Sequence, residues 1–465
     1  MVSQNLSLLR KKYPHIYEKI NSIDLTDQYK IVNLNSSYPT LKIEDASGKY
    51  YLHSKYNPKK EAEKFVLQNY DESKSIYMIY GTGFFYHVKY LLEIRDNIEI
   101  YILETNPYIL KCALESIDIS CILESKRAKI IFRDDVVDFS MEFSKILKNS
   151  DIELIIHKPS LRAMPQEFQE VKWSLEEYDM KVKTRRKFSS SMKENFMENV
   201  KMYDHGLDIL FRKFNRKPAI LVSAGPSLDK NKHLLKKLKN KALILCVSSA
   251  VRALDDIDVV PDIIIAIDPS ENLYNKHLKD LIINVPIILL ATGDKNIMRN
   301  YAGIKFITFQ RGYKLSEEYC KEHHIKAIDV GGSVATAGLE VLINFGCNPI
   351  IFMGQDLAYT DFKTHCDKVI DRKVVRDLSK LRKIEGVNTE YVYTNAALYS
   401  FLRWIENKIR EHKDLTFIDA TEGGAKIQGT LVMPLEEIIK KKICDSTINV
   451  CKIILERINQ YEGNE

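Results

Sequence analysis

The sequence predicts an α/β protein with a Rossmann-like N-terminal domain, a larger Rossmann-like central domain and a short helical C-terminal tail. Short apolar runs typical of buried strands are followed repeatedly by small-residue turns and then by helical periodicity, which indicates mostly parallel sheets. At 465 residues the chain is also too long for one ordinary hydrophobic core. More than one α/β domain is therefore expected.

The composition is typical of a soluble globular protein, with 45% apolar and 28% charged residues. The net charge of +6 is spread over lysine-rich helix faces, so no nucleic-acid partner is predicted. No run of about 18 apolar residues and no secretion-type leader occurs, so we expect neither a membrane span nor export. The eight cysteines form no CxxC pair and have no metal-ligand spacing, which favours a cytoplasmic protein without a metal site.

Residues 1–165 are predicted to form the N-terminal domain, with a leading helix within residues 1–20. Alternating residues from Thr40 to His53, interrupted by Asp45-Ala46-Ser47-Gly48, predict a β-hairpin.

A glycine-containing turn in this domain is the first candidate binding feature. The strand Ile76–Tyr80 precedes Gly81-Thr82-Gly83 and a helix, and the next strand ends on Glu104. This spacing is similar to that of nucleotide-binding Rossmann units, in which an acidic residue holds a ribose. Tyr86 stands in the place of the third glycine, so a structural Rossmann-like domain is favoured over a nucleotide site.

Residues 166–215 are predicted to be a helical connector that contains the domain boundary. The basic run Lys183–Lys187 is expected to lie between two helices, and Ser189–Ser191 to cap the second of them.

Residues 216–432 are predicted to form the central domain, which begins with the strand Ala219–Val222. Ser223–Ser227 form a small-residue turn, and an amphipathic helix with Leu234 and Leu238 on its apolar side is expected next. Free N–H groups at the start of that helix, together with its dipole, would make an anion site.

Small and polar residues recur where the predicted strands of this domain end. Ligands of parallel sheets bind at the carboxyl ends of the strands, so a binding cleft is predicted there. The candidate binding residues are Ser223, Gly225, Pro226, Ser227, Ser248, Ser249, Asp268, Gly332, Ser333, Thr336, Gln355, Gly423 and Gly424.

Two further segments complete the chain. Residues 360–395 lack strong periodicity, which predicts a flap or insertion beside the cleft. Residues 433–465 form a helical tail with apolar residues at near-heptad intervals, which we expect to pack on the body of the protein or on a second subunit in a homo-oligomer.

Four stretches together resemble the motility-associated factor (Maf) glycosyltransferases of bacterial flagellin. They are Ser223–Asp229, Gly332–Thr336, Gly354–Tyr359 and Thr421–Ala425, and the segment Leu52–Pro58 also fits that family's N-terminal domain. The resemblance implies a sialyltransferase-like central domain that uses a CMP-activated nonulosonic acid, either pseudaminic or legionaminic acid, with no separate cofactor. It also implies flagellin serine or threonine hydroxyls as acceptors. The short tail after Gly424 departs from the longer family members.

Two other functions remain open. The central motifs also resemble an archaeal 6-hydroxymethylpterin pyrophosphokinase, which would use ATP and magnesium, and a fold alone does not fix a reaction. A non-catalytic scaffold in flagellar export is the third hypothesis, and it would require the polar residues of the cleft to be inert.

Transfer to a hydroxyl needs a base and donors for the departing phosphate. The candidate bases are His365, Asp356 and Glu422, and an imidazole suits this task because it titrates near neutral pH. The resemblance supports His365, since histidine is the base in the related sialyltransferases. Tyr359 is a candidate donor to the leaving phosphate, and no metal is required.

Overall fold

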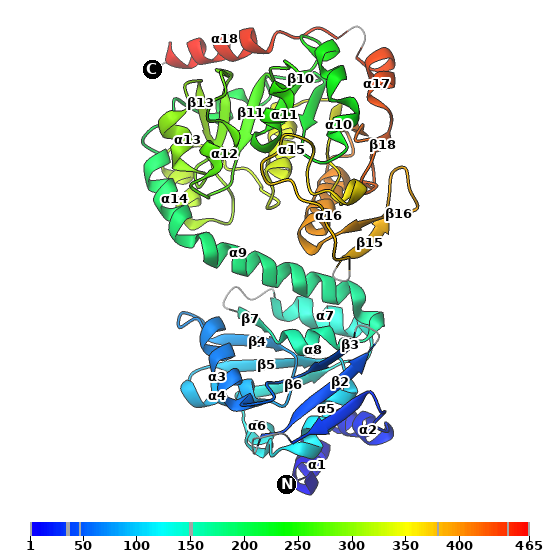
Figure 1. The fold of residues 1–465 in the computed structure, drawn as a ribbon. Coiled ribbons are helices and arrows are strands. Elements are labelled where there is room, and N and C mark those ends of the chain that lie inside the picture. Colours follow the sequence, from blue (N-terminus) through cyan, green and yellow to red (C-terminus); the bar gives the residue numbers. More distant parts are fainter. Residues whose placement is uncertain are drawn as a thin grey trace. The chain divides into compact units, whose positions relative to one another are not determined.

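The computed structural model of the chain describes residues 2–33, 38–45, 48–147, 152–378, 381–443 and 446–463 (Figure 1). The chain divides into two compact units, Met1–Met180 and Lys181–Glu465. Each unit has its own parallel sheet, which confirms the predicted pair of Rossmann-like α/β folds. The division falls inside helix α9 (Gln169–Asn199). Within the described residues, no helix is both long and apolar enough to cross a membrane.

The N-terminal unit is built on a four-stranded parallel sheet of order β6-β5-β4-β7. Its strands are apolar on both faces because both faces are covered. Along β4, Tyr77 and Ile79 enter one core, whereas Met78 and Tyr80 enter the other. The strands are β4 (Ile76–Tyr80), β5 (Glu99–Glu104), β6 (Ala128–Phe132) and β7 (Ile152–Ile156).

A three-stranded antiparallel sheet and a set of helices complete this unit. The predicted hairpin is confirmed as β2 (Thr40–Asp45) and β3 (Gly48–Tyr51), and β1 (Tyr29–Val32) adds a strand that the sequence pattern did not reveal. Residues 46–47 of the predicted turn lie outside the described residues. The helices are α1 (Val2–Lys12), α2 (Pro14–Ser22), α3 (Pro58–Asn69), α4 (Tyr86–Ile94), α5 (Pro107–Ser116), α6 (Ser120–Glu124), α7 (Val136–Leu147) and α8 (Lys158–Arg162).

The predicted break in the connector is wrong, because α9 runs without interruption through the basic run Lys183–Lys187 and through Ser189–Ser191. Lysine and arginine are good helix formers, and serine costs only about 0.5 kcal/mol relative to alanine inside a helix. No proline or glycine stands between Gln169 and Asn199 to end the helix.

The second unit contains a nine-stranded sheet of order β18-β17-β14-β9-β10-β11-β12-β13-β8 in which all neighbours are parallel (Figure 1). Ile220 of β9 is paired with Ile244 on one side and Ile351 on the other. The strands are β8 (His205–Gly206), β9 (Ala219–Val222), β10 (Leu243–Val247), β11 (Ile263–Ala266), β12 (Ile287–Leu290), β13 (Lys305–Thr308), β14 (Ile350–Met353), β17 (Phe417–Asp419) and β18 (Leu431–Val432).

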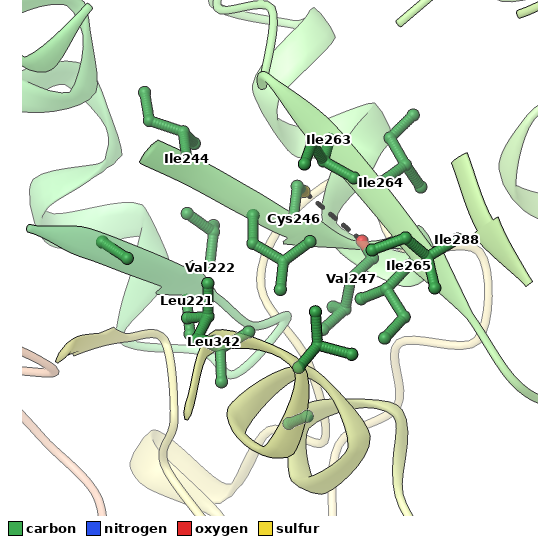
Figure 2. Close-up of a cluster of buried hydrophobic side chains, with 14 of the residues drawn as sticks. Leu221, Val222, Ile244, Cys246, Val247, Ile263, Ile264, Ile265, Ile288 and Leu342 are labelled. Carbon is green, nitrogen blue, oxygen red and sulfur yellow. Dashed lines mark hydrogen bonds between the residues drawn. The ribbon is translucent and has the colours of Figure 1, made fainter. Parts of the chain in front are cut away.

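The core of this unit lies between the sheet and its covering helices. Figure 2 shows Leu221 of β9 beside Leu342 of α15. The helices are α10 (Leu228–Asn231), α11 (Val251–Asp255), α12 (Leu273–His277), α13 (Lys295–Asn300), α14 (Lys314–Glu322), α15 (Val334–Phe345), α16 (Ala396–Glu411), α17 (Leu435–Lys441) and α18 (Val450–Glu462).

The helix expected after Ser227 is much shorter than predicted. Helix α10 contains four residues, and Lys232–Leu238 continue as a 3-10 helix. Leu235 and Leu238 are still buried, so the apolar pattern reflects core packing. The dipole of so short an α-helix is a weak source of anion affinity.

The remaining segments follow the prediction in part. The insertion after β14 contains an antiparallel hairpin, β15 (Arg382–Glu385) and β16 (Tyr391–Thr394). In the tail, α18 buries Val450, Ile454 and Ile458, and Arg457 Nε donates to the carbonyl of Ile209 at 2.9 Å. The tail therefore packs on the body of its own unit.

Candidate functional site

The candidate site lies where the strand order of the second sheet reverses. The chain adds β10 to β13 on one side of β9 and then returns through α15 to place β14 on the other side. The carboxyl ends of β9 and β14 therefore flank a topological switch point, which is where open α/β sheets bind ligands. The loops that follow these strands are Ser223–Ser227 and Gly354–Tyr359.

Asp356 joins these two loops. Ser227 Oγ donates to its Oδ1 at 2.7 Å, the Ser227 N–H donates to the carboxylate at 3.2 Å, and Thr360 Oγ1 is a further donor. The Asp356 side chain is buried, and burial raises its pKa to about 6. Beside it, Ser223 Oγ donates to Gln355 Oε1 at 2.6 Å. Ser223, Ser227, Gln355 and Asp356 therefore lie together at this edge of the sheet.

Gly225 is the point of closest approach between the loops. Its N–H donates to the carbonyl of Gly354 at 2.8 Å, and a Cβ at position 225 would lie 2.0 Å from Asp356 Oδ1. The N–H groups of Gly225 and Ser227 already have hydrogen-bond partners, and Pro226 has no N–H group. An anion bound here would therefore have to compete with Asp356 and Gly354 for these donors.

The loop after β17, Thr421–Ala425, is the third side of the site. The Ala425 N–H donates to the Asp356 carbonyl at 2.8 Å, and the Gly424 backbone packs against Asp356. Lys230 Nζ donates to the Glu422 carbonyl at 2.9 Å and lies beside Gly423. Three of the four stretches that carry the family resemblance therefore meet at one place.

His365 is held at the edge of this junction. The next residue, Cys366, donates its N–H to the carbonyl of Ala224 at 3.0 Å, and the Asp367 N–H donates to Asp229 Oδ2 at 2.8 Å. The His365 ring is half-buried, and its Nδ1 lies 3.2 Å from Thr364 Oγ1. Burial lowers the pKa of His365, and the nearby Asp371 opposes this shift.

Glu422, the second alternative base, is engaged in local structure. Its Oε1 accepts hydrogen bonds from Asn231 Nδ2 at 3.0 Å and from the N–H of Leu435 at 3.2 Å, where α17 begins. A carboxylate at a helix N-terminus is stabilised by the free N–H groups and the dipole. These contacts give Glu422 a structural task that the sequence did not reveal.

Tyr359 ends the loop that carries Asp356. Its hydroxyl accepts a hydrogen bond from Asn395 Nδ2, and its backbone N–H donates to the carbonyl of Tyr393 at 2.8 Å. Burial raises the pKa of Tyr359, so the phenol stays protonated at neutral pH and is able to donate.

A second histidine, His277 of α12, lies against the residue that follows β10. His277 Nδ1 is 3.2 Å from the buried Ser248 Oγ, and burial lowers the pKa of His277 to about 4. Lys276 is paired with Asp371 at 2.9 Å, which ties α12 to the segment that carries His365. The sequence feature that pointed to this place was Ser248, which follows a predicted strand.

Other predicted binding residues form local structure and make no described contact with Asp356. Ser333 and Thr336 form a capping box at the start of α15. The Asp268 carboxylate accepts a hydrogen bond from the N–H of Ser270 at 2.8 Å. Ser249 is half-buried, and Gly332 lies beside Phe401. Their roles in binding stay predictions.

The N-terminal sheet has its own switch point, between β4 and β7, and three histidines fill it. His157 stacks on both His53 and His87 with ring centroids 4.9 Å apart, and all three rings are buried. A Cβ at Gly83 would lie 2.6 Å from His53 Nε2, so protein atoms occupy the space beside the glycine turn.

Glu104, the expected ribose ligand of this domain, is also engaged internally. Its carboxylate accepts from the N–H and Oγ1 of Thr82 and from the N–H groups of Thr105 and Asn106, at 2.9 to 3.0 Å. These contacts agree with a structural Rossmann-like domain.

Comparison with known proteins finds one similar family model and one similar solved structure. The model of a family described as 6-hydroxymethylpterin diphosphokinase MptE-like matches residues 193–362. No curated protein matches the sequence. Among solved structures, the chain is similar to the MAf glycosyltransferase from Magnetospirillum magneticum AMB-1, with 14% identity and a TM-score of 0.47; the match covers 99% of this chain and 78% of that chain.

Proposed function

We propose that this chain is a glycosyltransferase that moves a nonulosonic acid, pseudaminic or legionaminic acid, from its CMP-activated form to serine or threonine hydroxyls of flagellin. The observation that carries the proposal is the position of His365 at the β9/β14 switch point. The Cys366–Ala224 hydrogen bond holds the backbone next to His365 against the Ser223–Ser227 loop, and Nε2 of His365 makes no hydrogen bond with the described residues.

The geometry suits removal of a proton from an acceptor hydroxyl. A lowered pKa keeps the His365 imidazole neutral at pH 7, so its free nitrogen is able to accept that proton. As the acceptor oxygen bonds to the anomeric carbon of the sugar, the bond from that carbon to the CMP phosphate oxygen breaks. CMP leaves with the bonding electron pair, and we propose the Tyr359 hydroxyl as the donor to its phosphate. No separate cofactor enters this scheme.

The family match to residues 193–362 favours a second candidate, a 6-hydroxymethylpterin pyrophosphokinase. That reaction also transfers a group from a nucleotide to a hydroxyl, so it would make the same demand on His365. The two candidates differ in the nucleotide, which is a CMP-sugar in one case and ATP with magnesium in the other.

Titration calorimetry with CMP and with ATP–magnesium separates them. The glycosyltransferase predicts saturable CMP binding that is weakened by a change at Ser227, whereas tight ATP–magnesium binding without a response to CMP supports the kinase. Binding of neither nucleotide, together with no mass increase of flagellin incubated with the protein and either CMP-nonulosonate, would leave the scaffold hypothesis.

A further inference from the structure

A cavity of about 660 Å³ lies in the second unit, away from the candidate site. Its polar lining residues are Arg212, Asn215, Arg216, Asn348, His412 and Asp414, and Ile343 and Leu415 give it an apolar side.

This cavity is at the amino ends of the strands whose carboxyl ends form the candidate site. Arg216 precedes β9, Asn348 precedes β14 and Leu415 precedes β17, each by two or three residues. These three strands are parallel neighbours, so their starts lie along the same edge of the sheet. The cavity and the candidate site therefore occupy opposite edges.

The backbone fixes the two arginines at the cavity. The N–H groups of Arg212 and Arg216 donate to the carbonyls of Asn344 and Gly346 at 2.8 and 2.9 Å. Between them, Phe214 is fully buried and stacks on Phe345 with ring centroids 5.2 Å apart. Both arginines have left-handed backbone, with φ of 61° and 58°, a conformation that costs about 1 kcal/mol or more for a residue with a side chain.

The guanidinium groups of Arg212 and Arg216 have no hydrogen-bond or ion-pair partner among the described residues. Capping of α15 does not need them, because backbone N–H groups already bond the carbonyls at its end. The cavity thus has two guanidinium groups and the single carboxylate of Asp414, which leaves an excess of positive charge.

We infer that this cavity binds a small organic anion that carries a phosphate or carboxylate group. A guanidinium offers paired N–H donors that match both groups. The Asn215 amide adds a donor, and the apolar side formed by Ile343 and Leu415 suits the carbon skeleton of a metabolite rather than a bare ion. This site is independent of the function proposed above.

The test is titration calorimetry on the full-length chain with two probes, inorganic phosphate and succinate. We expect saturable binding of at least one probe, and the preferred probe identifies the anionic group. The double variant Arg212→Gln/Arg216→Gln should bind that probe at least about tenfold more weakly, as expected when charge-assisted hydrogen bonds are lost. A Lys213→Gln/Arg403→Gln variant is the matched control, since both residues are exposed, lie outside the cavity lining and carry the same total charge.

Binding unchanged in the arginine variant, equal weakening in the control, or no binding of either probe at millimolar concentration would overturn the inference. Retained binding in the presence of saturating CMP supports it, whereas competition with CMP would place the anion at the other edge of the sheet and overturn it. If the double variant unfolds, the single variants Arg212→Gln and Arg216→Gln replace it, and each must weaken binding.

Discussion

Gly225 and Asp356 approach so closely that a Cβ at position 225 would lie 2.0 Å from Asp356 Oδ1 and 2.4 Å from the carbonyl oxygen of Gly354. The φ angle of Gly225 is not in the left-handed range, so the requirement for glycine here is one of space. The contact joins the loops after β9 and β14, and through them the two halves of the sheet.

Gly225→Ala is therefore expected to destabilise the second unit by about 1–3 kcal/mol, because neither Asp356 nor the Gly354 backbone has room to move freely. Gly423→Ala is the matched control in the same site, since its Cβ would lie 3.3 Å or more from its neighbours. Thermal unfolding of both variants checks the prediction, and equal stability of the two would contradict it.

Asp356 gives a second prediction. Asp356→Ala leaves the buried hydroxyl and N–H of Ser227 without their acceptor, at a cost of about 1–3 kcal/mol for each group that stays unpaired. Urea unfolding measures this loss, and Asp255→Ala is the control because Asp255 is exposed and its φ is not in the left-handed range. The same variant should weaken CMP binding if the loop after β9 holds the nucleotide. A loss of stability below about 0.5 kcal/mol would mean that water replaces the carboxylate.

The stacked histidines of the N-terminal unit predict acid sensitivity. Burial lowers the pKa of His87 to about 3 and that of His157 well below its ordinary value. Because these folded-state values lie below the unfolded value of about 6.5, the stability they confer is present above that pH and is lost as the pH falls below it. The His87 ring reduces the free energy of unfolding by about 2 kcal/mol between pH 7 and pH 5, and His157 changes it in the same direction.

Hydrogen exchange of the β4 amides at several pH values measures how steeply the free energy of unfolding falls as the pH is lowered. His87→Leu removes one titrating ring, so it should weaken this dependence of stability on pH even though the variant also loses the bond to the Gly81 carbonyl. His15→Leu, at an exposed position in the same unit, should keep most of the slope. Identical slopes for the wild type and His87→Leu would show that the rings are not the origin.

Periodicity predicted the strands of both sheets because each is a short apolar run that ends in small residues, as in Ala219–Val222 before Ser223. The same logic placed the loops after β9, β14 and β17 at one edge. It missed β8 (His205–Gly206) and β18 (Leu431–Val432), because each has only two residues and pairs at an edge of the sheet.

The contacts that decide the roles of single residues depended on long-range packing. Nothing near Glu422 in the sequence indicates its bond to Leu435, and His53, His87 and His157 are brought together only by folding. The strand-end rule also selected Ser333 and Thr336, whose polarity serves a helix cap. Polar residues at strand ends thus located the edge of the site, but they did not separate ligand contacts from caps and turns.

The last prediction concerns His365. If it removes the proton from the acceptor hydroxyl, His365→Ala should lower turnover by about a hundredfold or more, while CMP binding changes little because the base contacts the acceptor. The control is His233→Ala, at an exposed position in the same unit. Since burial lowers the pKa of His365, wild-type activity should rise with pH through a midpoint below 6.5, and this rise should disappear in the variant. Rates of sugar transfer measured from pH 5 to pH 8 provide the profile.

A variant that keeps most of its rate would exclude His365 as the base. The next candidate would be His277, because Asp371 is near both histidines. Loss of CMP binding in the variant would instead make His365 a ligand of the donor phosphate.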